Sequence, residues 1–315
     1  MPGTARTDGN PRMAGGSLGC SYIAGSAERP VHVERIAASA EVPPRSPVVM
    51  VHGGCHTGDC YLSTPDGREG WAGLFARAGH EAYVVDWPGR GRSPRCEDLP
   101  RLSTREIADS LRVLVESIGP AILLVHSAGG PIGWWIAEAA PAAVAAVIGV
   151  APGAPANILP VLPDDPAEIA KLRHDTSLGC PVLMPEDRPV CVDEEFIRTF
   201  WANAPRFPKD ALASYCGSIV PESARVFNER FNIGGRGLKL GNPAALMSIP
   251  TLVVTGDHDP RHPRAVDEAT ARYVGAEFVW LPDRGITGNG HMPMIEDNSL
   301  EIAELLLAWL RDKGL

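Results

Sequence analysis

The segment Ala121-Ile-Leu-Leu-Val-His-Ser-Ala-Gly-Gly130 carries the pattern that decides the fold. Its five leading apolar residues predict a buried strand, and residues 131–140 behind it predict a helix opened by a proline. A serine on a tight strand-to-helix turn is held clear of the sheet, as in a nucleophile elbow. Ser127 is therefore the candidate nucleophile, and a plain helix N-cap is the alternative. The usual Gly-x-Ser-x-Gly pattern is incomplete, because Val125 occupies its first position.

Strand and helix patterns alternate outward from this segment. Ser103 and Glu106 form a predicted capping box before an apolar stripe with helical spacing. Apolar runs predict further strands, and an amphipathic pattern predicts a closing helix. The strands are expected at 48–51, 82–85, 143–150, 251–255 and 278–281, and the helix at 300–310. This alternation predicts an α/β fold, a mostly parallel sheet with helices on both faces.

Residues 153–242 break the alternation. They are rich in proline, acids and aromatics, and they contain no apolar run typical of a buried strand. We therefore expect a cap or lid inserted into a core made of residues 19–152 and 243–315. Residues 1–18 have no apolar signal core and are predicted to form a flexible N-terminal tail, which favours a cytoplasmic location.

Composition excludes several classes of protein. The 315 residues carry a net charge of −9, which disfavours nucleic acid and anionic membranes as partners. No run of 18 apolar residues is present, so no transmembrane helix is predicted. The 7 cysteines are an odd number, so at least one thiol is free. Two pairs, Cys55 with Cys60 and Cys180 with Cys191, are close enough in sequence for a bridge, although reduced thiols are favoured.

A loop that could stabilise an oxyanion follows the strand at 48–51. The sequence there is His52-Gly-Gly-Cys55, and the glycines free the backbone so that an N–H can point into a cavity. We expect the amides of Gly54 and Ala128 to be the two donors, with Cys55 as the alternative to Gly54. Read alone, the same residues fit an ordinary turn at the end of a strand.

The general base and its acid are expected on later loops. His291 lies between the last predicted strand and the last helix, where its ring can reach Ser127. Asp257 and Asp259 both follow the strand at 251–255. The chain order serine, acid, histidine is that of an α/β-hydrolase triad.

At this point a family resemblance can be stated. From about Gly19 to its end the chain resembles the α/β-hydrolase superfamily, and within it the bacterial 713-like esterase branch. The stretches that carry the resemblance are His52-Gly-Gly-Cys55, Thr57-Gly58, Thr64-Pro-Asp-Gly-Arg68 with Gly70-Trp71, Gly89-Arg-Gly-Arg-Ser93, and Gly288-Asn-Gly-His-Met292 with Asp297-Asn298.

The resemblance implies an ester-cleaving enzyme with Ser127 as nucleophile and His291 as base. Two departures stand out. The branch tends to have adjacent cysteines that form a disulfide in the oxyanion loop, but Gly54 replaces the first of them. The branch also tends to carry its acid as a glutamate after the strand that follows the elbow helix, where this chain has Ala151-Pro-Gly153. The superfamily pattern Gly-x-x-Asp then selects Asp259 over Asp257.

The sequence thus predicts a serine hydrolase for a carboxylic ester or lactone, with no metal or organic cofactor. Trp134, Phe200 and Trp201 are expected to line the substrate pocket, with core packing as the alternative. One alternative function is a lyase of the same fold, which for cyanohydrin chemistry would need a cation such as Lys171, Lys209 or Lys239. Another is a catalytically silent ligand-binding protein. The expected partner is a small ester or lactone, and the chain could also pair with a second copy of itself.

Overall fold

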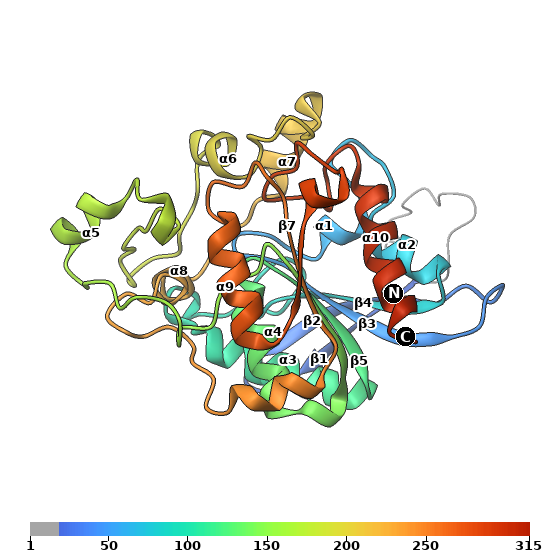
Figure 1. Cartoon of the computed structure of the whole chain (residues 1–315). Coiled ribbons are helices and arrows are strands. Elements are labelled where there is room, and N and C mark those ends of the chain that lie inside the picture. The colour runs from blue at the N-terminus through green and yellow to red at the C-terminus, as the bar shows by residue number, and fades with distance from the viewer. Residues whose placement is uncertain (1–18) are drawn as a thin grey trace, which may run out of the picture.

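A computed structural model describes residues 19–315, which form one eight-stranded sheet with helices around it (Figure 1). The predicted tail, residues 1–18, lies outside the described residues. The strands are β1 Gly19–Gly25, β2 Pro30–Ile36, β3 Arg45–Val51, β4 His80–Asp86, β5 Ala121–His126, β6 Val144–Val150, β7 Thr251–Thr255 and β8 Glu277–Trp280. Their order across the sheet is β1-β2-β4-β3-β5-β6-β7-β8, and of these eight only β2 runs against the others. The prediction of a mostly parallel sheet is confirmed.

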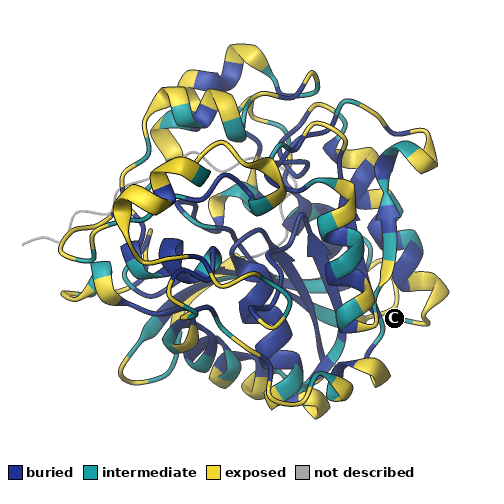
Figure 2. Cartoon of the chain, turned by 60° about the vertical axis from the view of Figure 1, so that its left-hand side comes forward, coloured by how far each residue is buried: buried dark blue, intermediate teal, exposed yellow. Residues whose placement is uncertain are grey.

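Helices cover both faces of this sheet, as predicted. Alternate residues of β3 enter different cores. Val48 and Met50 pack on the side of α2 (Trp71–Arg77) and α10 (Ser299–Asp312). Val49 and Val51 pack on the side of α3 (Thr104–Ile118), α4 (Gly129–Ala139) and α9 (Arg264–Val274). Figure 2 shows the strands buried between these layers. The α-helices are α1 Asp59–Leu62, α2 Trp71–Arg77, α3 Thr104–Ile118, α4 Gly129–Ala139, α5 Pro166–Leu172, α6 Glu194–Phe200, α7 Leu212–Ser218, α8 Ala224–Arg230, α9 Arg264–Val274 and α10 Ser299–Asp312.

Local signals predicted six of the eight strands, β3 to β8, and three of the helices, α3, α4 and α10, within a few residues of their observed bounds. α3 begins with the predicted capping box, because Ser103 accepts a hydrogen bond from the Glu106 amide and the Glu106 side chain accepts one from the Ser103 amide. α4 begins two residues before the predicted Pro131. A Cβ at Gly130 would lie 2.4 Å from the Gly153 carbonyl oxygen, so only glycine fits where the helix passes that loop.

Residues 153–242 contain α5 to α8 and contribute no strand to the described sheet. In Figure 1, α6 and α7 lie at the top of the molecule and α5 lies at the left. This segment touches the loop after β3 directly: the Val220 amide donates to the Cys55 carbonyl (2.9 Å), and the Tyr215 hydroxyl lies 2.9 Å from His56 Nε2. The division into a core and a cap stays a prediction.

The described residues also show the state of the cysteines and the character of the helices. Every one of the seven cysteines is a free thiol, so neither Cys55 with Cys60 nor Cys180 with Cys191 is bridged. Within residues 19–315, no helix has the length and apolar character needed to cross a membrane.

Candidate active site

Ser127 stands on a sharp turn between β5 and α4. Its φ of 51° is in the left-handed region, which is strained for a residue with a side chain. Two hydrogen bonds hold this conformation, because the Ser127 carbonyl accepts from the amides of Gly130 (2.8 Å) and Gly153 (2.7 Å). A Cβ at Gly53 would lie 2.9 Å from Ser127 Cβ, so the adjacent loop can pass only as glycine.

Three parallel strands bring Ser127 together with His291 and Asp259. Ser127 follows β5, Asp259 follows β7, and His291 lies on the loop after β8, all at the carboxyl edge of the sheet. His291 Nε2 is 2.9 Å from Ser127 Oγ, and His291 Nδ1 is 2.6 Å from Asp259 Oδ2. The order of the three side chains is that of a nucleophile, a base and an orienting acid.

Burial and neighbouring charges set the ionisation of the His291 and Asp259 side chains. Burial lowers the pKa of His291 below its usual value, although Asp259 acts in the opposite direction. Burial alone would raise the pKa of Asp259, but the His291 and His262 rings and the hydrogen bonds it accepts lower it below its usual range. A neutral His291 beside an ionised Asp259 can take a proton from Ser127 at neutral pH.

The expected oxyanion donors lie beside this serine. Gly54 and Ala128 both line the cavity at Ser127, and a Cβ on Gly54 would be 3.8 Å from Ala128 Cβ. Among residues 19–315 neither amide N–H has a protein acceptor. The alternative donor does not fit, since the Cys55 amide donates to Glu222 Oε2 (3.1 Å).

Glu222 supports the oxyanion loop from the segment 153–242, a role that the sequence did not reveal. Its carboxylate is fully buried and forms an ion pair with the buried guanidinium of Arg90. Arg90 belongs to the Gly89-Arg-Gly-Arg-Ser93 motif, but no sequence signal marks Glu222. His56 holds the same loop, because its Nδ1 lies 2.7 Å from the Gly54 carbonyl oxygen and donates to it.

The loop that carries His291 is fixed by two carboxylates and a histidine. Glu296 accepts from the Asn289 side chain and from the Gly290 amide (2.7 Å). Asp257 accepts from the amides of Gly288 (2.9 Å) and Asn289 (3.2 Å), so it ties down this loop rather than its own turn. His126 Nε2 donates to the His291 carbonyl oxygen (2.8 Å). The sequence signal for Glu296 was only its place a few residues after His291.

The predicted pocket aromatics lie elsewhere. Trp134 is fully buried in the core, and its indole N–H donates to the Gly153 carbonyl (2.9 Å), so the prediction that it lines the pocket is wrong. The Trp201 ring packs on the His56 ring, with centroids 4.8 Å apart. The Phe200 ring lies under the Arg261 guanidinium, whose Cζ atom is 5.6 Å from the ring centroid. Neither is among the residues that line the small cavity at Ser127. These residues are Gly54, Ser127, Ala128, Val226, Phe227, Arg230 and Arg261.

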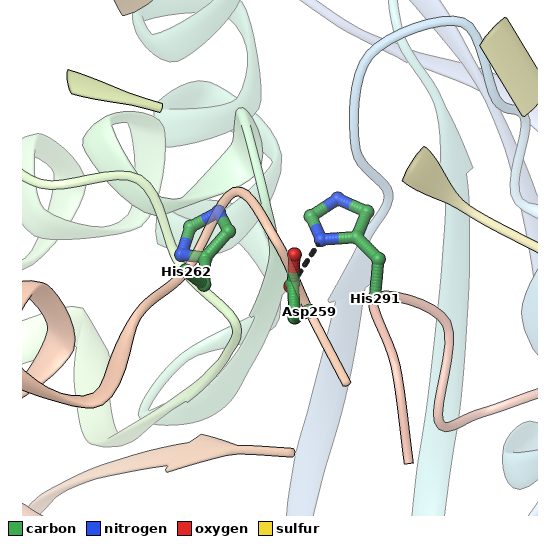
Figure 3. Close-up of side chains that lie close together, drawn as sticks. All are labelled: Asp259, His262 and His291. Carbon is green, nitrogen blue, oxygen red and sulfur yellow. Dashed lines mark hydrogen bonds and ion pairs between the residues drawn. The ribbon is translucent and has the colours of Figure 1, made fainter. Parts of the chain in front are cut away.

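A metal ion has little to bind here. Asp259, His262 and His291 place ligand atoms within 4.8 Å of one another, and Figure 3 shows Asp259 between the two rings. The atoms are already engaged: His262 Nδ1 bonds to Asp267 (3.0 Å) and its Nε2 to Arg230 (3.2 Å). The guanidinium groups of Arg230 and Arg261 also face this region and disfavour a further cation.

Comparisons with known proteins support the assignment of the fold. A curated relative, the "Probable secreted lipase phiG" of Fungal sp. (strain ATCC 74256), is 26% identical over 371 residues, covering 96% of this chain and 92% of the relative.

Three solved esterases share the fold. An esterase from Exiguobacterium antarcticum has a TM-score of 0.65 and 18% identity, over 94% of this chain and 99% of that one. A thermophilic esterase from Thermogutta terrifontis has a TM-score of 0.63 and 19% identity, over 94% and 99%. A structure described as that of a novel bacterial esterase has a TM-score of 0.56 and 19% identity, over 98% and 99%.

The sequence model of the alpha/beta hydrolase family matches residues 48–305, which include strands β4 to β8, the elbow and the histidine loop described above. The match spans more than half of the chain. This chain therefore belongs to the alpha/beta hydrolase family.

Proposed function

We propose that this protein is a serine hydrolase that cleaves a carboxylic ester or lactone through an acyl-enzyme on Ser127. The observation that carries the proposal is the hydrogen-bonded chain from Ser127 Oγ through the His291 ring to Asp259. His291 Nε2 takes the hydroxyl proton as Ser127 Oγ attacks the carbonyl carbon of the substrate. The amides of Gly54 and Ala128 donate to the oxygen that becomes negative.

His291 then returns the proton to the leaving alcohol, and the acyl group stays on Ser127. A water molecule gives its proton to His291 and attacks the acyl carbon, which releases the acid and restores the serine. None of these steps requires an organic cofactor. The proposed cap, residues 153–242, supports the site through Glu222 and Tyr215 and would shield the acyl group from bulk water.

Two experiments test the proposal directly. Turnover of 4-nitrophenyl acetate would distinguish a hydrolase from a silent binding protein. A fluorophosphonate should add its phosphonyl group to Ser127 and to no other serine, as read by peptide mass spectrometry. Labelling of the folded protein at another residue, or no turnover of any ester, would overturn the proposal.

The lyase alternative has weaker support. None of the three lysines named for it lines the cavity at Ser127: Lys171 pairs with Glu168 on the exposed helix α5, and Lys209 and Lys239 lie elsewhere. The cations that do line this cavity are Arg230 and Arg261, so an assay of cyanohydrin cleavage is needed to test the lyase.

The compartment is a separate proposal. We keep a cytoplasmic location, which the seven free thiols support, and cell fractionation would test it against the secreted location in the relative's name.

A further inference from the structure

Two arginine side chains form one wall of the cavity at Ser127. Arg261 lies two residues after Asp259 on the loop that follows β7, and Arg230 ends α8 in the segment 153–242. Both also line the neighbouring cavity, whose other walls include the apolar side chains of Leu162 and Leu178. A molecule bound at Ser127 would therefore meet both guanidinium groups.

Neither guanidinium has an anionic partner within residues 19–315. Arg261 is 6% exposed, and its Nε atom has no hydrogen-bond partner. The Arg230 side chain makes one hydrogen bond, from Nη2 to the ring nitrogen His262 Nε2 (3.2 Å). Arg29, by contrast, contacts two carboxylates, those of Asp98 and Glu106, at 2.6 and 2.7 Å.

The nearby carboxylates are already used by other groups. Asp259 holds His291 and accepts from the Arg261 amide (3.0 Å), and Asp267 bonds to Thr255 and His262. Glu222 is paired with Arg90. A buried cation without a counter-ion is unfavourable, so the buried Arg261, with the half-buried Arg230 beside it at one cavity, indicates that the anion arrives with a ligand.

Aromatic packing accounts for part of the environment but not for the donors. The Arg261 Cζ atom lies 5.3 Å from the Phe231 ring centroid and 5.5 Å from that of Phe196, and Arg230 Cζ lies 4.8 Å from that of Phe231. Aromatic faces favour a cation, but they do not accept the in-plane N–H bonds of a guanidinium. Burial, reinforced by Arg230, lowers the pKa of Arg261 to about 9, a penalty that a bound anion would relieve.

We propose that Arg230 and Arg261 form a subsite for a carboxylate of the substrate, so that the preferred ester bears a carboxylate on its acyl or its alcohol part. A guanidinium presents N–H groups in a plane that matches a carboxylate. The apolar walls of Val226 and Phe227 would contact the chain between this carboxylate and the scissile carbonyl. This inference rests on the proposed hydrolase function.

Two matched substrate pairs test the proposal and show which part of the ester carries the charge. The acyl pair is mono(4-nitrophenyl) glutarate against 4-nitrophenyl pentanoate, and the alcohol pair is 4-butanoyloxybutanoate against butyl butanoate. We expect kcat/KM to favour the charged member of one pair by about tenfold to a hundredfold, as for hydrogen bonds to a charged group. Equal rates within both pairs would overturn the subsite.

Substitutions assign the preference to these residues. Arg261→Gln and Arg230→Gln should each reduce the charged-to-neutral ratio about tenfold, and Arg261→Lys should keep part of it. Arg264→Gln is the matched control, because Arg264 pairs with Asp283 on the outer surface (2.8 Å) and should leave the ratio as it is. A ratio that persists in both Gln variants overturns the assignment.

The charged-to-neutral rate ratio tests the carboxylate subsite separately from the hydrolase function. The ratio compares two substrates on the same protein, so a general loss of rate in a variant cancels. If Arg261→Gln does not fold, Arg230→Gln and competitive inhibition of the wild type by free glutarate give the same decision. Cleavage of neutral esters without any charge preference contradicts only the subsite, whereas no turnover and no labelling of Ser127 contradict the hydrolase itself.

Discussion

At the scale of single residues, the site depends on one strained serine and the ring that faces it. Replacing Ser127 by alanine removes the Oγ atom that lies 2.9 Å from His291 Nε2 and leaves the turn otherwise intact. We expect esterase turnover to fall by about 10⁶-fold, the loss typical of a triad nucleophile. The measurement is a steady-state assay on variant protein whose melting curve matches the wild type. Retention of more than about a tenth of the rate would show that Ser127 is not the nucleophile.

The two aspartates after β7 differ in what they hold. Asp259→Asn removes the charge that orients His291 and should slow turnover about 10⁴-fold, with little loss of binding. Asp257→Asn keeps one acceptor for the amides of Gly288 and Asn289, so it should cost up to about 2 kcal/mol of stability and leave most activity. Urea denaturation and kcat, measured on both variants, separate these effects. A dead Asp257→Asn with an active Asp259→Asn would reverse the two roles.

At the scale of elements, the oxyanion loop after β3 is supported by a residue from another part of the chain. Glu222→Gln leaves Arg90 buried without its partner and weakens the acceptor of the Cys55 amide. Removing one member of a fully buried pair costs about 3–5 kcal/mol, and the loosened Gly54 amide should lower kcat more than it raises KM.

The control and the double variant make this test specific. Glu168→Gln removes the exposed pair with Lys171 and should change neither stability nor kcat measurably. The pair Glu222→Leu with Arg90→Met removes both charges and should be less destabilised than Glu222→Gln alone. If Glu222→Gln were as stable and active as the control, Glu222 would have no part in holding the loop.

Elements defined by local sequence patterns are the ones that the sequence predicts correctly. Strands β5, β6 and β7, the α3 capping box and the loop positions of Ser127, Asp259 and His291 follow from local patterns, because apolar runs and the residues after them are adjacent in sequence. Strands β1 and β2, which pair antiparallel at one end of the sheet, lack the continuous apolar runs of the central strands, so the sequence analysis does not identify them. Glu222 and Arg261 could not be found, since their roles exist only once the chain has brought distant loops together.

Errors about the aromatics have the same origin. The position of Trp134 near the elbow predicts a place in the pocket. In the structure Trp134 is buried on α4, and its indole N–H donates to the Gly153 carbonyl oxygen. Composition suggested that residues 153–242 lie over the site, and contacts from Val220 and Tyr215 to the loop after β3 agree with that interpretation. No periodic pattern could specify which cap side chain would reach Ser127.

At the scale of the whole molecule, burial of neutral histidines makes stability depend on pH. Burial lowers the pKa of His52 to about 4 and that of His56 to about 3, and lowers the pKa of His126 well below its usual value. In the unfolded chain these three rings titrate near pH 6.5. Below that pH the unfolded state therefore binds about three more protons at these rings than the folded state, and the lowered pKa values of His291 and His80, which are also caused by burial, act in the same direction.

Glu296 opposes this trend, because burial raises its pKa to about 7 and the folded state holds its proton where the unfolded state releases it. The three rings and Glu296 together give an uptake of about two protons on unfolding near pH 5.5, so the free energy of unfolding should fall by at least about 2.7 kcal/mol per pH unit as the pH falls. Urea denaturation between pH 7.5 and pH 5 would measure this slope. Glu296→Gln removes the opposing carboxyl group, so its slope should be steeper by about 1.4 kcal/mol per pH unit. A stability that stays constant down to pH 5 would mean that the buried rings are already protonated in the folded state.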